Sequence, residues 1–252
     1  DVPSEFKHKL MFWYFRNVVL LSDQTVKRFK EAHPVMTKLL DFNIYQAPYL
    51  GIDSDLPEKV RSMDYETDLN PEKINVVCPG FIHEKKGYHK MPEIIEKLSE
   101  EYPDIRLTFA GGKHRNGSQE YFDKLKEKIE ATSVSNQITI TGVLDSEYHV
   151  YKYVDEADVV VLPFENISQS ASLVKTLAMG TVPVVTPLDT LKPVIEKYGG
   201  AMSEDHTSES LLEAIQSILE TTTEENSSNI LQELSWEKNT ERYIEFYDRI
   251  II

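Results

Sequence analysis

Residues 74–110 read INVVCPGFIHEKKGYHKMPEIIEKLSEEYPDIRLTFA, and the pattern within them decides the fold. The stretch begins with an apolar, β-branched run at Ile74–Cys78 and ends with a second one at Ile105–Ala110. Between these runs, apolar residues recur at the spacing of an amphipathic helix, as at Ile94 and Leu98. Two runs that are apolar nearly throughout, joined by a helix, predict neighbouring parallel strands buried on both faces of a sheet.

The same alternation continues toward the C-terminus. Further strands are predicted at Gln137–Thr141, Asp158–Leu162 and Val182–Thr186. Apolar residues at helical spacing lie between and after these runs, at 121–129, 173–178, 211–219 and 236–250. This order predicts an α/β fold, a doubly wound, Rossmann-like parallel sheet with helices on both faces.

The first part of the chain follows a different plan. A strand is predicted at Asn17–Leu21, a helix at Asp23–Ala32 and a second strand at Asn43–Ala47, too few elements for a domain of their own. We therefore expect a remnant of a second α/β domain at the N-terminus, and the start at Asp1 suggests a truncated or processed protein. The predicted divisions are 1–52 for that remnant, 53–73 for a linker, 74–235 for the main domain with an exposed loop at 221–229, and 236–252 for a closing helix.

Composition excludes several classes of function. The 252 residues carry 42 acidic and 27 basic side chains, a formal net charge of −15, which disfavours binding to nucleic acid or to an anionic membrane surface. Cys78 is the only cysteine, which excludes an intrachain disulfide framework and a Cys-based zinc site. A single cysteine and the lack of a long apolar run indicate a cytoplasmic protein.

Positive charge is concentrated in two loops at predicted strand ends. They span Pro79–Lys90 and Gly111–Gly117, and both contain glycine, lysine and histidine. Because ligands of open parallel sheets bind at the carboxyl ends of strands, these loops are a candidate diphosphate site, although solvated surface loops would have the same composition. His83 and His114 lack a carboxylate at metal-ligand spacing, so no metal site is expected.

A third candidate segment precedes the helix expected from Leu173. Residues 163–172 read PFENISQSAS, and small hydroxyl residues before a helix leave its first N–H groups free for an anion. An ordinary serine N-cap would give the same pattern. The chain has no Gly-x-Gly-x-x-Gly motif opening its first helix and no Walker loop, which disfavours a dehydrogenase or a P-loop NTPase.

Four segments taken together resemble a known family. They are GFIHEKKG at 80–87, TFAGG at 108–112, ADVVVLP at 157–163 and SASLVKTLAMGTVPVV at 170–185. In this order and at these spacings they resemble the carboxyl-terminal, donor-binding half of the family 4 (group 1) glycosyltransferases of GT-B fold. The resemblance covers about residues 74–252, and residues 1–52 are similar to the end of the family's first domain.

The resemblance implies a retaining, metal-independent glycosyltransferase without a cofactor. The expected donor is a UDP- or GDP-linked sugar, and the expected acceptor is a hydroxyl on a sugar, a lipid-linked molecule or a protein. Most of the acceptor-binding domain would lie outside this chain. Two other readings stay open: a non-catalytic nucleotide-sugar-binding or interaction module, and a GT-B epimerase or phosphorylase.

Site residues follow from the matched motifs. Lys86 matches the lysine that contacts the donor diphosphate and stabilises negative charge on the departing nucleotide. The resemblance therefore implies that Lys86 is the catalytic residue. Ser170, Ala171 and Ser172 match a turn whose backbone N–H groups bind the same diphosphate.

The remaining matched positions complete the expected donor site. Gly80 and Gly112 match glycines that line the cleft, and Phe81 or Val143 is expected to flank the base.

The chain departs from the family pattern at several positions. Phe81 stands where arginine is usual, which removes one cation from the diphosphate site. A pair of glutamates eight residues apart is usual where this chain has Ile167 and Lys175, and a lysine cannot accept the ribose hydroxyl protons that the second glutamate would bind. Lys175 could instead pair with a donor phosphate, and Glu165 could substitute in part for a missing carboxylate or be a solvated loop residue.

Overall fold

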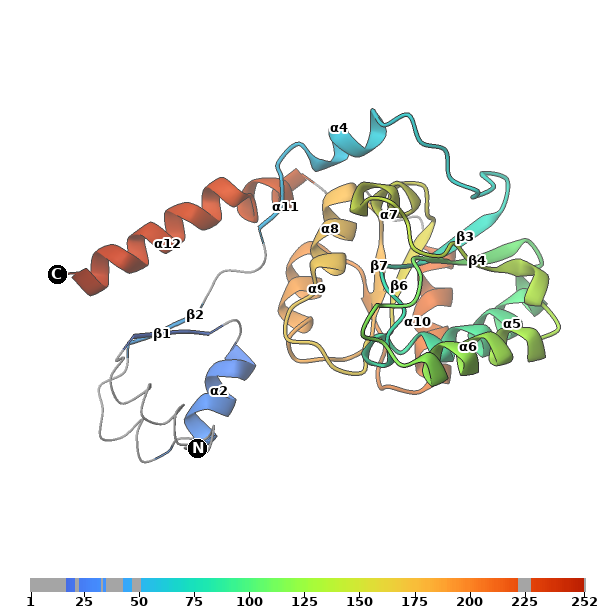
Figure 1. The fold of residues 1–252 in the computed structure, drawn as a ribbon, viewed down its shortest axis with the longest axis horizontal. Coiled ribbons are helices and arrows are strands. Elements are labelled where there is room, and N and C mark those ends of the chain that lie inside the picture. Colours follow the sequence, from blue (N-terminus) through green and yellow to red (C-terminus); the bar gives the residue numbers. More distant parts are fainter. Residues whose placement is uncertain are drawn as a thin grey trace.

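The computed structural model describes residues 17–20, 23–32, 34, 43–46, 51–221 and 228–251. Its largest part is a six-stranded sheet in the order β5-β4-β3-β6-β7-β8, in which every neighbouring pair is parallel. The strands are β3 (Ile74–Pro79), β4 (Ile105–Ala110), β5 (Ile138–Ile140), β6 (Val159–Leu162), β7 (Pro183–Val185) and β8 (Ala201–Met202). The predicted doubly wound α/β fold is confirmed (Figure 1).

Helices cover both faces of this sheet because alternate residues of each central strand point in opposite directions. Val76 and Cys78 belong to one core cluster, and Val77 belongs to the other. The first cluster includes residues of α5 (Met91–Glu101), α6 (Gln119–Ala131) and α10 (Ser208–Glu220). The second includes residues of α7 (Glu147–Asp155), α8 (Ala171–Met179) and α9 (Lys192–Tyr198). Three short 3-10 turns complete the domain, at Glu84–Lys86, Tyr88–Lys90 and Ser135–Gln137.

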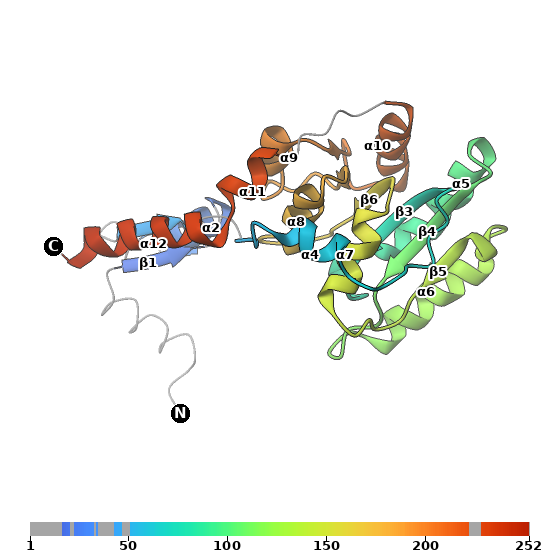
Figure 2. The ribbon, with the colours of Figure 1, turned by 90° about the horizontal axis from the view of Figure 1, so that it is seen from above.

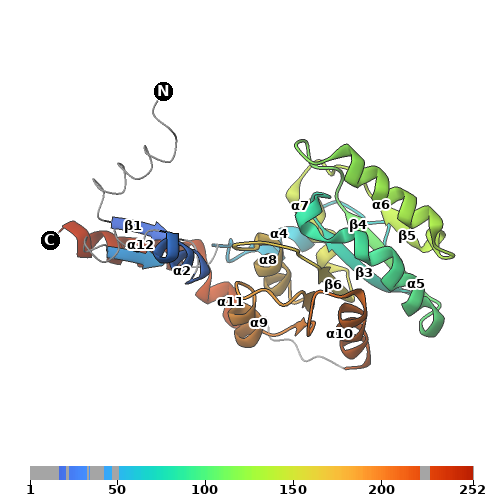
Figure 3. The same cartoon turned by 90° about the horizontal axis from the view of Figure 1, so that it is seen from below.

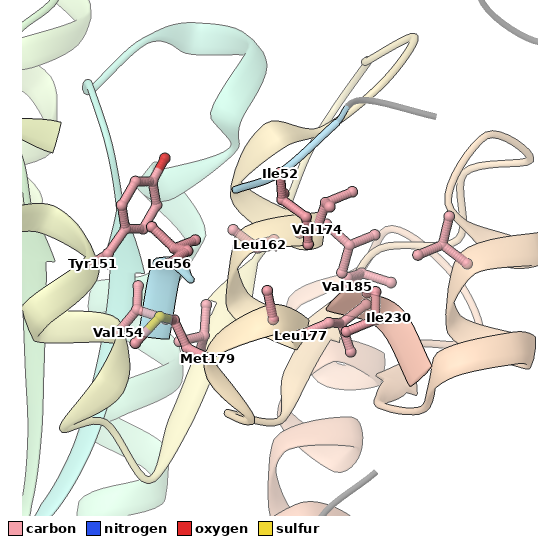
Figure 4. Packing of buried hydrophobic residues seen from close by; sticks show 14 of the residues in the cluster. Ile52, Leu56, Tyr151, Val154, Leu162, Val174, Leu177, Met179, Val185 and Ile230 are labelled. Atoms are coloured by element: carbon pink, nitrogen blue, oxygen red, sulfur yellow. The ribbon is translucent and has the colours of Figure 1, made fainter. Parts of the chain in front are cut away.

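Part of the range predicted as a linker is packed into the domain. Helix α4 (Leu56–Arg61) lies within 53–73, and its Leu56 and Val60 are buried in the cluster that contains α7 and α8. Figure 4 shows Leu56 beside Tyr151, Val154 and Met179 in this cluster. Glu58 and Lys59 of this short helix are exposed, while its apolar residues Leu56 and Val60 are buried.

The chain enters and leaves this domain at one place. Ile52 and Ser235 form a parallel bridge, in which the N–H of Ile52 donates to Leu234 and the N–H of Trp236 donates to Ile52. A Cβ atom on Gly51 would lie 2.4 Å from the Trp236 ring, so the two crossing segments are in close contact. Helix α11 (Ser228–Glu233) precedes the crossing, so the last two residues of the predicted 221–229 loop are helical.

The remaining elements lie beyond this crossing. Strand β1 (Asn17–Leu20), helix α2 (Asp23–Ala32) and strand β2 (Asn43–Gln46) lie where the sequence predicts a strand, a helix and a strand. The two strands pair in parallel. Helix α12 (Trp236–Ile251) runs away from the six-stranded sheet toward the side where β1 and β2 lie (Figures 2 and 3). Phe12–Phe15, an aromatic group in the sequence, lies outside the described residues.

Five described helices and strands are missing from the sequence prediction: α4, α7, α9, α11 and β8. Helix α9 has seven residues and β8 has two, too few to show a period in the sequence. Helix α7 has a recognisable start, because Ser146 caps it by accepting a hydrogen bond from the N–H of Tyr148 at 3.1 Å. The Ser146-Glu147 pair followed by Val150, Tyr151 and Val154 is the signal that would have found it.

The burial of α4 predicts the effect of Leu56→Ala. Leu56 is 2% exposed, and its truncation should lower the free energy of unfolding by about 2 to 5 kcal/mol. Urea unfolding measures this loss, and Glu58→Ala on the exposed side of the same helix is the control, expected within about 0.5 kcal/mol of the unchanged protein. If Leu56→Ala lowered the free energy of unfolding no more than the control does, the packing of α4 would not stabilise the domain, and 53–73 would behave as a linker.

Candidate functional site

The centre of the sheet is the place where the strand order reverses. From β3 the chain continues outward to β4 and β5, whereas from β6 it continues in the opposite direction to β7 and β8. The loops that follow β3 and β6 therefore separate, and a crevice opens between them at the carboxyl ends of the strands. The first of these loops is Gly80–Gly87, and the second is Pro163–Ser170.

The two loops meet at the floor of this crevice. Gly87 has φ +67°, and a Cβ atom there would lie 1.9 Å from the carbonyl oxygen of Pro163. The N–H of Glu165 donates to the carbonyl oxygen of Lys85 at 2.9 Å. Only glycine permits this approach, which fixes the turn that carries Lys86 against the loop after β6.

Lys86 lies at the centre of the crevice without an acidic partner. Its Nζ atom is 3.4 Å from both the carbonyl oxygen of Pro79 and the Oγ atom of Ser172, and 5.1 Å from the centre of the Phe164 ring. None of the ion pairs among the described residues includes Lys86. The ammonium is thus held by neutral oxygens and an aromatic face.

This environment changes the acidity of the lysine. Desolvation by burial lowers the pKa of Lys86 to about 8, and no carboxylate opposes that effect. The same surroundings raise the pKa of the neighbouring Cys78 thiol, chiefly through its complete burial, so Cys78 stays neutral. A buried cation without a counter-charge is costly unless an anion binds beside it.

Helix α8 starts next to Lys86. The Oγ atom of Ser170 accepts a hydrogen bond from the N–H of Leu173 at 3.0 Å, so Ser170 is the N-cap. Ser170 is 1% exposed, and its hydroxyl caps the helix. Ser172 is the second residue of α8, and its hydroxyl points toward Lys86. The positive end of the helix and the lysine are therefore adjacent.

A pocket of about 410 Å³ opens above these groups. Its walls come from the loops after β3 and β4 and from the start of α7. The lining residues are Gly80, Phe81, His83, Lys86, Gly111, His114, Leu144, Ser146, Glu147, Val150, Tyr151 and Ser172. Lys86 is the only lysine or arginine of this lining. The apolar side chains from the α7 wall suit a flat ring, and the Lys86 end suits an anion.

Two histidines share the wall formed by the β3 and β4 loops. The N–H of Lys85 donates to Nδ1 of His83 at 3.2 Å, and the N–H of Asn116 donates to Nδ1 of His114 at 3.1 Å. In the neutral form of each ring the proton therefore lies on Nε2. Phe81 is 48% exposed and packs edge-on against His114, with 5.3 Å between ring centroids. In the described part of the chain, no group of three His, Cys, Asp or Glu side chains could hold a metal ion.

Lys175 has a partner that the sequence did not predict. Its Nζ atom is 2.8 Å from a carboxylate oxygen of Glu147 and 4.6 Å from the centre of the Tyr151 ring. Desolvation alone would lower the pKa of Lys175, but the hydrogen bond to Glu147 and the interaction with Tyr151 hold it above its ordinary value. Glu147 and Tyr151 line the pocket, and no residue of α7 was a predicted site residue.

The predicted site residues are only partly brought together. Gly80, Phe81, Lys86 and Ser172 line the pocket. Gly112 packs against Val143, where an added Cβ atom would lie 2.6 Å from the Val143 nitrogen, and Val143 is 65% exposed. Neither residue is among those that line the pocket. Ser170 caps α8 and Ala171 is its exposed first residue, while Lys175 reaches the pocket through Glu147. Glu165, the other candidate carboxylate, pairs with Lys90 at 2.7 Å, outside the pocket lining.

The contact between Gly87 and Pro163 predicts a larger cost for alanine there than at a comparable glycine. Gly142 also has a left-handed backbone, with φ +80°, but nothing lies within 4 Å of an added Cβ atom. Gly142→Ala should cost only the backbone strain, about 1 to 2 kcal/mol in urea unfolding. Gly87→Ala should cost about 1 to 3 kcal/mol more, since the two loops must separate. Equal losses for the two variants would contradict the proposed role of the contact.

Solved structures with the same architecture cover nearly all of this chain. An α,α-trehalose-phosphate synthase (UDP-forming) from Burkholderia vietnamiensis matches with a TM-score of 0.82 and 8% identity, over 100% of this chain and 66% of that one. Anabaena HepE, solved in complex with UDP and glucose, matches with a TM-score of 0.75 and 15% identity, over 92% of this chain and 63% of that one. Sucrose-phosphate synthase from Thermosynechococcus elongatus matches with a TM-score of 0.71 and 17% identity, over 93% of this chain and 58% of that one. The chain thus spans about 58% to 66% of the length of these proteins and shares their GT-B fold.

The remaining comparisons concern the sequence and its helices. No curated protein sequence matches the chain. Among the described residues, none of the helices has the length and apolar character that crossing a bilayer requires. Residues 62–248, which contain the whole pocket, match the family described as glycosyl transferases group 1. The chain therefore belongs to the group 1 glycosyltransferases.

Proposed function

We propose that the pocket binds the diphosphate of a nucleotide-linked sugar and that the chain is the carboxyl-terminal, donor-binding half of a glycosyltransferase. The observation that carries this proposal is Lys86, a desolvated cation without an acidic partner beside the start of α8. An anion bound there would contact the ammonium, the Ser172 hydroxyl and the free N–H groups of the first helical turn. The matching solved structures with UDP in their names support a uridine diphosphate as the first ligand to test.

The proposed reaction places negative charge where these groups lie. The bond between the anomeric carbon and the terminal phosphate oxygen breaks, a bond to the acceptor oxygen forms, and the acceptor releases its hydroxyl proton. Lys86 and the start of α8 stabilise the negative charge left on the nucleotide. Because groups of this chain supply the counter-charge, the proposed transfer is metal-independent, and we place it among the retaining transfers.

The two ends of the donor have different environments in this proposal. Leu144, Val150 and Tyr151 offer an apolar wall for the base. The acceptor, a hydroxyl of a sugar, a lipid-linked molecule or a protein, would be bound by a second α/β domain to which β1, α2 and β2 belong. We propose a cytoplasmic location, in keeping with the single buried Cys78.

A second candidate function is a donor-binding module that performs no transfer. The observation that favours it is Phe81, which occupies a pocket position without supplying a charge, so that Lys86 is the only lysine or arginine among the described residues of the lining. The two functions differ in whether the bond to the sugar breaks. Release of UDP or GDP from UDP-glucose or GDP-mannose by the unchanged protein, lost in Lys86→Met, would favour transfer.

The first test of the proposal is calorimetric titration with UDP, GDP and ADP. One of them should bind saturably, and Lys86→Met should weaken that binding by about 10- to 100-fold, the value of a hydrogen bond to a charged group. Lys85→Met is the matched control, since Lys85 is exposed in the same turn and lies outside the pocket lining. Absence of binding by all three nucleotides, or equal losses in the two variants, would reject the proposal.

The lowered pKa of Lys86 predicts how binding depends on pH. Above about pH 8 the free protein loses the ammonium proton, which must be regained when the diphosphate binds. Affinity should therefore be constant from pH 7 to about 8 and fall by up to about tenfold per pH unit above it. Lys86→Met should lack this fall, and a parallel decline in both proteins would assign it to another group.

A further inference from the structure

The pocket contains one carboxylate among the residues that line it, and this is Glu147. Glu147 is the first residue of α7, directly after the N-cap Ser146. The ionised side chain can only accept hydrogen bonds. The pocket therefore has a cation at one place and a strong acceptor at another.

Lys175 fixes the position of this carboxylate. The ion pair joins the first turn of α7 to α8, with 2.8 Å between the Lys175 Nζ atom and a Glu147 oxygen. The Lys175 side chain is itself 19% exposed and lies over the Tyr151 ring, whereas the Glu147 side chain is 61% exposed. The lysine is thus anchored in the protein, and the exposed remainder of the carboxylate is free to accept from a ligand.

The ion pair lies beside the anion-binding end of the pocket. Ser172, which contacts Lys86, and Lys175 are three residues apart on α8 and therefore on the same face of the helix. Three residues correspond to about 4.5 Å along the helix axis. A ligand whose phosphates contact Lys86 and Ser172 would accordingly place its next chemical group near Glu147.

Hydroxyl groups are the natural partners of this carboxylate. Several other polar side chains of the lining present donors, namely Lys86 and the Nε2–H groups of His83 and His114 in their neutral form. In a nucleoside diphosphate the group next to the phosphates is the sugar of the nucleoside, which in a ribonucleotide carries two adjacent hydroxyls. Each hydroxyl needs an acceptor when it leaves water.

We infer that Glu147 accepts hydrogen bonds from the ribose hydroxyls of the bound nucleotide, and that Lys175 positions it. Resting on the proposed nucleotide site, this makes the charge pair a determinant of selectivity for ribonucleotides over deoxyribonucleotides. Lys175 then acts through Glu147 and does not contact the phosphates. If the pair only joined α7 to α8, its removal would lower stability and leave nucleotide selectivity unchanged.

The experiment compares UDP, GDP and ADP with their 2′,3′-dideoxy forms by calorimetric titration. The unchanged protein should bind the ribonucleotide at least about tenfold more tightly than its dideoxy form. Glu147→Gln should reduce this ratio to less than about threefold, mainly by weakening ribonucleotide binding. Lys175→Met should also reduce the ratio, because the carboxylate is no longer held in place.

Glu156→Gln is the matched control. Glu156 follows the last turn of the same helix and pairs with Lys152 at 3.2 Å, outside the lining of the pocket, so its loss should leave the ratio unchanged. A tenfold preference retained in Glu147→Gln, or equal binding of both forms by the unchanged protein, would overturn the inference. Lys86-dependent binding without a preference would leave the nucleotide site standing and reject only the role of Glu147. No binding of any nucleotide would overturn both.

Discussion

Gly87 lies against the carbonyl oxygen of Pro163, and this contact fixes the turn that carries Lys86, the lysine of the pocket lining. It joins the loops that follow the two central strands, at the point where the strand order reverses. Without a Cβ atom at Gly87, the turn that carries Lys86 comes close enough for its ammonium to meet Ser172 at the start of α8. A backbone requirement at one residue thus places a lysine ammonium next to the start of a helix.

Lys86 differs from the ion-paired lysines of this acidic chain. The protein is acidic overall, with a net charge of −15, and most of its lysines in ion pairs are at the surface. Lys86 differs in being desolvated and without an acidic partner. A desolvated cation without an acidic partner lowers stability, so its presence is best explained by a ligand that supplies the missing charge.

The position of Glu147 in the pocket wall depends on two helices, α7 and α8, that pack on the same face of the sheet. Helices α7 and α8 share one core cluster with α4, so their relative positions are fixed by buried apolar contacts (Figure 4). That packing allows Glu147 and Lys175, 28 residues apart in sequence, to form an ion pair at the pocket. The apolar packing of α7 against α8 therefore determines where the Glu147–Lys175 ion pair lies.

The sequence by itself determined five of the six strands of the large sheet, β3 to β7, together with the two basic loops and the lysine. Apolar runs such as Val76–Cys78 and Val159–Leu162 read as buried strands because both of their faces are covered, and the Gly-rich, Lys-containing loop after the first run marks its end. Only the tertiary structure decided what Lys175 contacts, that Ser170 is a buried cap, and that Gly112 and Val143 are not among the residues lining the pocket. The physical reason is that side-chain partners depend on how separate helices pack. Helix α7, which supplies much of the pocket wall, is short and was not recognised from its sequence, so its partners could not be assigned in advance.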